Sequence, residues 1–452
     1  MISLFRKKLS AKKIEQLEEA VISASEEGRC EAAWENIQTL QNAQKNQENV
    51  AESLIRLVED RYLPHTQGLE VLAAIYDDYK GNSKIVSLIG SALEGARDID
   101  ELNLGPPEHP LFKSVVNDLA NAVENPDIKN EEKILNGLST AARMMGRQFD
   151  SVAEKSFRRL VEIDPNHPSY LYSLGLYCKT RGLFKDGMLA NQKALALVDK
   201  PVESYQWNLG ICATGAGEGE IALEIWKSIG NKIEMGRFNL PEGGYPQCKV
   251  KLAQRPLAER NISNDDPGLE ETIWIERLSP CHGIIRSVLY QDLGVDYGDV
   301  ILMDGAPITY HTYGDKQIPV FPHLATLVRS NYSFFNFAAT QMENGQVSDL
   351  SLSLQKDAII YVHSENFRVL CETCWQDNQI NHAEHKGEKK NIVTGRIAAP
   401  SDISSQELLS QIDDALVELE NCKIYSPELC ESAGFKERAE VEKHRFNMLL
   451  NN

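Results

Sequence analysis

The sequence lacks several features that would point to a common activity or location. It contains no run approaching the roughly 20 apolar residues that a membrane-spanning helix needs. It also has no glycine-rich loop that follows a strand and carries a lysine to bind phosphate. Neither the Gly-x-Ser-x-Gly motif of serine hydrolases nor the His-Glu-x-x-His motif of zinc proteases occurs. We therefore expect no membrane span, and nucleotide-dependent and common hydrolytic activities become less expected.

Basic residues are also in short supply. The chain has 47 lysine and arginine residues against 66 acidic ones, which gives a formal charge of −19. Such a field repels polyphosphates, so we expect no nucleic-acid binding. The basic start of the chain has no apolar segment behind it and does not read as a secretory signal, and we expect the protein in the cytoplasm.

Length and composition are those of a globular protein. The 452 residues, 42% hydrophobic and 25% charged, exceed one ordinary hydrophobic core, so we expect two or three domains. The nine cysteines are spread along the chain instead of forming a dense framework. That distribution is typical of reduced thiols in a cytosolic protein.

Residues 11 to about 235 have the pattern of consecutive helices. Apolar positions recur three and four residues apart, and the breaks fall at short polar segments with proline, glycine or asparagine. Within this region the small residues Ala153, Gly187 and Ala222 are separated by 34 and then 35 positions. A nearly constant step indicates a repeated unit.

This unit resembles the tetratricopeptide repeat (TPR), whose period is about 34 residues. Besides the three small residues, the resemblance over residues 136–234 rests on Phe157, Leu160, Asp164 and Pro165, then Leu174, Gly175, Gly182, Ala194 and Leu195, then Leu209, Gly210, Gly217 and Trp226. It implies stacked helical hairpins with a concave face that binds a segment of another protein.

The resemblance also implies partner-binding residues. Tyr172, Lys179 and Gln206 lie on the first helices of two repeats, near positions that face the ligand in the family. Asn191 departs from the motif, since an aromatic residue is usual there. We expect loose packing around Asn191 unless its neighbours compensate.

The pattern changes at Phe238, where a glycine- and proline-rich linker is followed by short β-type segments mixed with a few helical ones. We therefore predict three parts. Residues 1–135 form degenerate repeats or a helical cap, 136–236 form TPR-like repeats, and 237–452 form an α+β mixed-sheet domain. The predicted fold class is an all-α helical-hairpin solenoid followed by that α+β domain.

One segment of the second half has the residue types of a zinc site. Cys371, Cys374, His382 and His385 supply two thiolates and two imidazoles in short pairs, which suit a tetrahedral ion. However, 367–375 alternates like a strand, so the two cysteines would point to opposite faces. We favour a buried Cys371 and histidines at the tip of a hairpin that returns through 391–398, with zinc as the alternative and no other cofactor expected.

Other polar residues of this half have structural interpretations. Asp292, Asp296, Asp299 and Asp304 flank the apolar run 300–303, as turns at the two ends of a strand would. We interpret the aromatic run 332–337 as a central strand that is buried on both faces rather than as a binding groove. Cys281 next to His282 invites a nucleophile interpretation, but adjacent strand residues face opposite ways, and we favour a turn cysteine.

Binding of another protein is the best supported function, as an adaptor, a regulator or an immunity-type inhibitor of a basic partner. The alternative is an enzyme with a Cys/His/Asp or zinc-dependent site in residues 237–452, which we favour less. It would need Asp299 or Asp304 to share a pocket with His311, His363 or Cys281.

Overall fold

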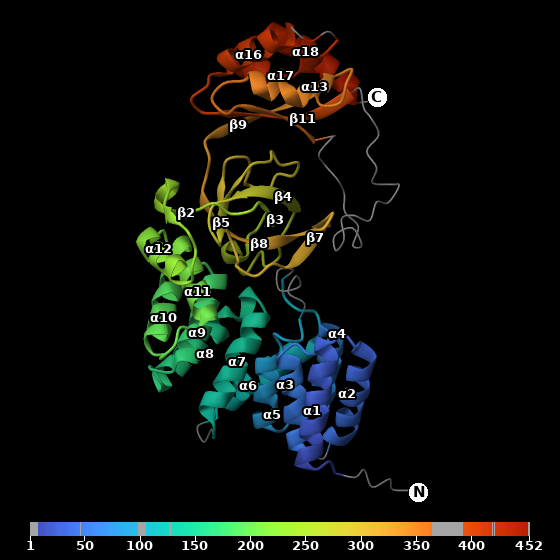
Figure 1. The fold of residues 1–452 in the computed structure, drawn as a ribbon, viewed down its shortest axis with the longest axis vertical. Coiled ribbons are helices and arrows are strands. Elements are labelled where there is room, and N and C mark those ends of the chain that lie inside the picture. Colours follow the sequence, from blue (N-terminus) through green and yellow to red (C-terminus); the bar gives the residue numbers. More distant parts are fainter. Residues whose placement is uncertain are drawn as a thin grey trace. The chain divides into compact units, whose positions relative to one another are not determined.

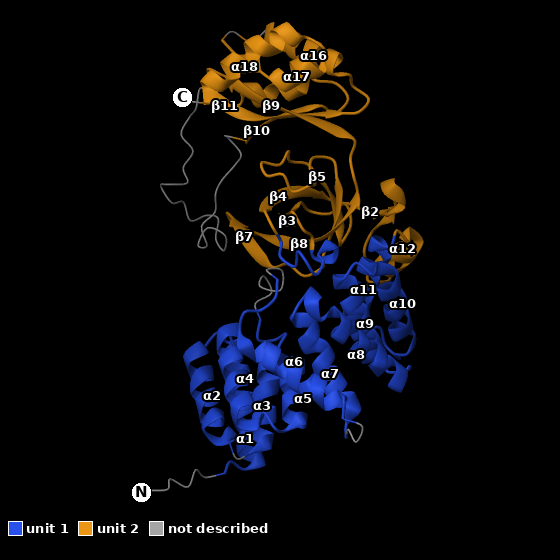
Figure 2. Cartoon of the chain, turned by 180° about the vertical axis from the view of Figure 1, so that it is seen from behind, with its two compact units in different colours: residues 1–216, 257–267 blue, residues 217–256, 268–452 orange. Residues whose placement is uncertain are grey.

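The computed structural model describes residues 8–45, 47–97, 105–125, 129–363, 392–417, 419 and 421–450. The chain divides into two compact units, coloured differently in Figure 2. The helical unit comprises Met1–Ala216 together with Leu257–Pro267, and the β unit comprises Gly217–Pro256 together with Gly268–Asn452. The division thus falls before the boundary expected at residue 236, and a segment from the β half returns to the helical unit.

The described part of the helical unit contains eleven α-helices, labelled in Figure 1. They are α1 (Ala11–Glu26), α2 (Cys30–Gln44), α3 (Glu48–Glu59), α4 (His65–Tyr79), α5 (Ser83–Ala92), α6 (Pro110–Val123), α7 (Glu131–Met144), α8 (Asp150–Ile163), α9 (Pro168–Thr180), α10 (Phe184–Ala196) and α11 (Glu203–Gly215). One apolar core runs from Ile14 in α1 to Cys178 in α9. It holds α1 to α9 together because each of these amphipathic helices contributes apolar residues three and four apart.

Successive helices pack as antiparallel hairpins, which confirms the predicted TPR-like solenoid. Helices α7 and α8 pair, and so do α9 and α10. The small residues of the motif lie where the helices approach most closely: a Cβ at Gly187 would come within 2.8 Å of the Cys212 sulfur. The 34-residue spacing therefore records a steric requirement.

The packing around Asn191 is closer than we expected. The side chain is fully buried, and its Nδ2 donates to the carbonyl of Gly187 at 2.7 Å. A Cβ at Gly175 would lie 2.2 Å from that same nitrogen. Gly175 thus makes room for the amide, which is the compensation by a neighbour that the motif's missing aromatic residue required.

Gly175→Ala is accordingly expected to destabilise the helical unit by about 1–3 kcal/mol, because the added methyl group overlaps the buried amide. Urea unfolding followed by circular dichroism measures the change. Gly81→Ala is the matched control, since a Cβ there meets nothing within 4 Å. Adding Asn191→Ala to Gly175→Ala should recover part of the loss; equal losses in the single and double variants would contradict this explanation.

The β unit begins with α12 (Gly219–Ser228) and the short pair β1 (Glu234–Met235) and β2 (Pro241–Glu242). Six further strands follow: β3 (Cys248–Ala253), β4 (Glu270–Arg277), β5 (His282–Ile285), β6 (Val300–Met303), β7 (Thr309–Tyr313) and β8 (Lys316–Val328). Their order is β3-β4-β5-β6-β8-β7, and a parallel pairing of β3 with β8 closes five of them into a small barrel. Alternate residues such as Val250 and Ile273 fill its interior.

A second sheet follows the barrel. Its strands β9 (Tyr332–Thr340), β10 (Ile359–Val362), β11 (Ile392–Pro400) and β12 (Lys423–Tyr425) have the order β10-β11-β9-β12 and are all antiparallel. Figure 1 shows the helices α13 (Gln346–Asp349), α16 (Ser405–Val417), α17 (Pro427–Ser432) and α18 (Lys436–Leu450) over one face. The aromatic run 332–337 lies in the interior strand β9. Phe337 packs in the core between the sheet and the helices, and Phe334 lies on the other face of the sheet.

The structure thus has the predicted fold class, a helical-hairpin solenoid followed by an α+β part. The predicted return strand 391–398 corresponds to β11. Among the residues that the structure describes, no helix has the length and apolarity that crossing a bilayer requires.

Candidate functional site

An aromatic pair lies on the first helices of two neighbouring repeats. The rings of Tyr172 in α9 and Tyr205 in α11 stack with their centroids 4.6 Å apart. Both side chains are half-buried, so part of each ring is open to solvent. Offset aromatic pairs of this kind offer a rigid apolar surface with polar hydroxyl ends, which suits contacts with another protein.

The three residues that the TPR resemblance implied for partner binding differ in accessibility. Tyr172 belongs to the aromatic pair, whereas Lys179 is 5% exposed and Gln206 is 9% exposed. Lys179 and Gln206 both have interactions within this chain. In this structure Tyr172 is therefore the member of the set that offers an accessible side chain, and their role in partner binding stays a prediction.

A segment of the chain is docked on the turns of the repeats. Leu257–Pro267, which we call the inserted segment, lies in the connection between β3 and β4 but belongs to the helical unit. The carbonyl of Leu257 accepts a hydrogen bond from Arg147, and the carboxylate of Asp265 accepts one from the Arg147 backbone at 2.5 Å. Ala258 packs at Gly182, where a Cβ would come within 2.8 Å of its carbonyl oxygen.

Two arginines at equivalent turn positions support this contact. Arg147 follows α7 and Arg181 follows α9, which is the 34-residue step of the repeat. Arg181 Nη2 lies 2.7 Å from Asp150, and Arg147 Nη1 lies 3.5 Å from the same carboxylate. Arg147 also donates to the carbonyl of Thr180 at 2.9 Å, so the turns of the two hairpins are tied together beneath the inserted segment.

Burial changes the acid–base properties of this network. Desolvation lowers the pKa of Arg147, and the neighbouring Arg181 charge lowers that pKa further. Desolvation raises the pKa of Asp265, while the Arg147 backbone amide opposes that rise. The Arg147 guanidinium thus pairs with the carboxylates of both Asp150 and Asp265, and removing it would take a positive charge away from both. Sequence reasoning missed this site, although Arg147 and Arg181 recur at the repeat period.

The acidic residues near 300 stabilise turns, as expected. Asp296 accepts hydrogen bonds from the backbone of Leu289 at 3.0 Å and Tyr297 at 2.8 Å, and it pairs with Arg396 of β11 at 2.6 Å. Asp299 accepts from the backbone of Ser330 at 2.5 Å. A carboxylate whose oxygens accept hydrogen bonds from backbone amides and pair with an arginine stabilises the loop that contains it.

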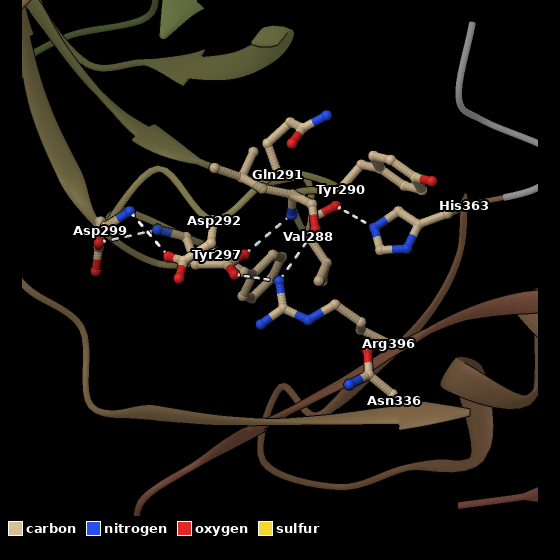
Figure 3. Close-up of polar contacts among 12 residues, drawn as sticks. Val288, Tyr290, Gln291, Asp292, Tyr297, Asp299, Asn336, His363 and Arg396 are labelled. Atoms are coloured by element: carbon tan, nitrogen blue, oxygen red, sulfur yellow. Dashed lines mark hydrogen bonds and ion pairs between the residues drawn. The ribbon is translucent and has the colours of Figure 1, made fainter. Parts of the chain in front are cut away.

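The residues named for an enzyme have separate partners. His363 lies 2.9 Å from the Val288 carbonyl, at the opposite end of the cluster in Figure 3 from Asp299. His311 contacts Lys249, and Asp304 accepts from the backbone of Gly305. The buried Cys281 lies 3.9 Å from the Ser279 hydroxyl. Among these described contacts none joins an acid, a histidine and the cysteine, so the enzyme hypothesis gains no support.

The predicted zinc ligands Cys371, Cys374, His382 and His385 lie outside the described residues, so the zinc site stays a prediction. Within the described ranges, no group of three or more histidine, cysteine, aspartate or glutamate side chains has a metal-binding arrangement.

No protein-family model matches the chain, and no curated protein matches it in sequence. Solved structures with helical repeats do align with it. PilF of Pseudomonas aeruginosa has 12% identity over 48% of this chain and 91% of its own, with a TM-score of 0.29. PilW, described as a type IV pilus biogenesis factor, has 15% identity over 49% of this chain and 93% of its own, with a TM-score of 0.33.

YrrB, described as a TPR protein with an unusual peptide-binding site, has 14% identity over 40% of this chain and 80% of its own, with a TM-score of 0.27. At such scores no residue role is transferred to this chain. The repeat architecture is instead supported by features of this chain itself, namely the helical hairpins and the 34-residue step between them. This helical unit is TPR-like.

Proposed function

We propose that this is a protein-interaction protein whose TPR-like hairpins bind an irregular segment of another protein. One observation carries the proposal: the hairpins already hold such a segment of their own chain, Leu257–Pro267. That segment has one short 3-10 turn, Leu257–Glu259, and otherwise no regular helix. The repeats hold it through a backbone carbonyl, which any polypeptide offers, and through a carboxylate, which an acidic segment offers.

A second surface of the repeats lies on the first helices α9 and α11. The half-buried Tyr172 and Tyr205 form an aromatic pair there, and aromatic anchors supply much of the energy of protein interfaces. The partner's segment would pack on these rings. In its narrower form the proposal is an adaptor or an immunity-type inhibitor of a basic protein, because the formal charge of −19 favours a positive partner.

Affinity capture with the full chain tests the proposal. A fragment ending at residue 236 is unsuitable, since it lacks the inserted segment that belongs to the helical unit. We expect a specific protein to be retained by the wild type and lost, by about tenfold or more, with Tyr172→Ala or Tyr205→Ala. Retention should also fall when salt is raised from about 50 mM to about 500 mM, because screening weakens charge complementarity.

Leu189→Ala is the matched control, because Leu189 is 53% exposed and lies on α10, which forms a hairpin with the helix α9 that carries Tyr172. It should retain the partner as the wild type does. Capture of the same proteins by the wild type and both tyrosine variants would refute the proposed surface, and so would the absence of any specifically retained protein.

A further inference from the structure

A buried lysine lies on the outer face of the barrel. Alternation along β3 places Cys248, Val250 and Leu252 in the interior, so Lys249 points outward. It pairs across the sheet with Trp274 of β4. Lys249 is nevertheless only 8% exposed, because Trp274 and side chains of β7 surround it.

The surrounding side chains converge on the ammonium group. Its Nζ lies 3.3 Å from His311 Nδ1 and donates to the Tyr313 hydroxyl at 2.5 Å. It also lies 5.2 Å from the centre of the Trp274 ring and 4.8 Å from that of Tyr313. These two rings contact each other with their centroids 5.6 Å apart. Three strands thus contribute to one cationic and aromatic cluster, which we call the Lys249 cluster (Lys249, Trp274, His311, Tyr313).

The described surroundings of this cluster lack a negative charge. Among the described residues no carboxylate oxygen lies within ion-pair distance of Lys249, whereas Lys251 on the same strand pairs with Glu270 at 3.3 Å. The buried Arg147 and the partly buried Arg181 likewise pair with carboxylates. A buried ammonium without a counter-ion costs several kcal/mol, and aromatic faces offset only part of that cost.

Among the residues that the structure describes, the hydrogen-bonding capacity of the lysine is also incomplete. An ammonium has three N–H donors, and His311 and Tyr313 accept two of them. Tyr313 is 40% exposed and Trp274 is half-buried, so the cluster reaches solvent along its rings. An anion that approaches there would gain both the remaining donor and the unneutralised charge.

We propose that the Lys249 cluster binds the carboxylate of a small organic acid with a flat apolar body. A single positive charge matches the single charge of a carboxylate, and lysine acts as a point charge that suits it. A phosphate dianion would need more positive charge than the cluster holds. The faces of Trp274 and Tyr313 would receive the apolar body by stacking.

Titration of the full-length protein with benzoate, followed by calorimetry and by tryptophan fluorescence, tests this proposal. We expect saturable binding in the range of about 0.1–10 mM. Lys249→Met keeps the length of the side chain and removes the charge, and it should weaken binding at least tenfold. Tyr313→Phe keeps the ring and should weaken it by a few-fold. Lys251→Met is the control on the same strand and should bind as the wild type does.

Two further probes define the ligand class. Benzamide has the same flat body without the charge and should not bind, and inorganic phosphate should not bind either. The proposal is overturned if benzoate fails to bind the folded wild-type protein, if it binds Lys249→Met and Tyr313→Phe with unchanged affinity, or if phosphate is the preferred ligand. Benzoate should also raise the thermal midpoint of the wild type and not that of Lys249→Met, which a purely structural lysine would not explain.

Discussion

Replacing Arg147 with alanine is expected to release the inserted segment and to destabilise the helical unit by about 3–5 kcal/mol. Arg147 is 4% exposed, and its guanidinium donates to the carbonyl of Leu257, whereas the backbone amide that binds Asp265 is kept in the variant. Without the guanidinium, the half-buried Asp265 loses the positive charge that pairs with it at 3.9 Å. Breaking a buried pair on one side costs more than the pair itself contributes, because the other charge stays buried.

Hydrogen exchange is the appropriate measurement, since the two units need not unfold together. Backbone amides of 257–267 should exchange at least tenfold faster in Arg147→Ala than in the wild type. Arg158→Ala is the matched control: Arg158 pairs with Glu154 and Asp186 on an exposed face of α8, where such pairs contribute less than about 1 kcal/mol. Equal exchange in both variants would show that Arg147 does not hold the segment.

Acidification from pH 7.5 to pH 5 is expected to destabilise the β unit by about 4 kcal/mol. Burial lowers the pKa of His282 to about 4, and burial likewise lowers the pKa of His323 to about 4. An unfolded chain binds these protons near pH 6.5, whereas the folded unit does not until about pH 4. The stability is therefore complete above about pH 6.5 and is lost as the pH falls toward 4, with each histidine contributing about 2 kcal/mol of the loss at pH 5.

The contacts of His282 explain why protonation is unfavourable. Its Nδ1 lies 2.5 Å from the Ser279 hydroxyl, and its Nε2 is buried without a hydrogen-bond partner among the described residues. An imidazolium there would place a charge in an apolar turn. Urea unfolding between pH 5 and 7.5 measures the slope of stability with pH. His282→Gln should reduce the number of protons that the chain binds on unfolding near pH 5 by about one, and the slope falls in proportion. His444→Gln, on an exposed position of α18, should leave the slope unchanged.

If stability did not change over this range, or if His282→Gln and His444→Gln behaved alike, the two histidines would not be the groups responsible.

Local patterns predicted the elements of both units well. The period of small residues located the hairpins because close helix contacts need small side chains at fixed steps, as Gly187 against Cys212 illustrates. The acids around 300–303 were correctly assigned to turns, since a carboxylate next to a short strand can accept nearby backbone amides. The aromatic run lies in an interior strand, as predicted, but it is not buried on both faces, since Ser333 and Asn336 are exposed.

The candidate sites were less predictable. Tyr172 was found through the repeat, but its stacking on Tyr205 depends on how α9 and α11 pack. The accessibility of Lys179 and Gln206 also depends on packing, and both are buried. The Lys249 cluster has no sequence signature, because its members lie on β3, β4 and β7 and meet only through strand pairing.

The helical hairpins, their 34-residue step, the acidic charge and the β-rich second half could be predicted from the residues alone, because they follow from composition and from periodic patterns along the chain. Tertiary structure alone decided three other features: the closure of the barrel by β3 and β8, the return of Leu257–Pro267 to the helical unit, and the burial of Lys249. The contact between Arg147 and Asp265 joins residues 118 positions apart. No local periodicity encodes such a contact, since it forms only where packing brings two complementary groups together.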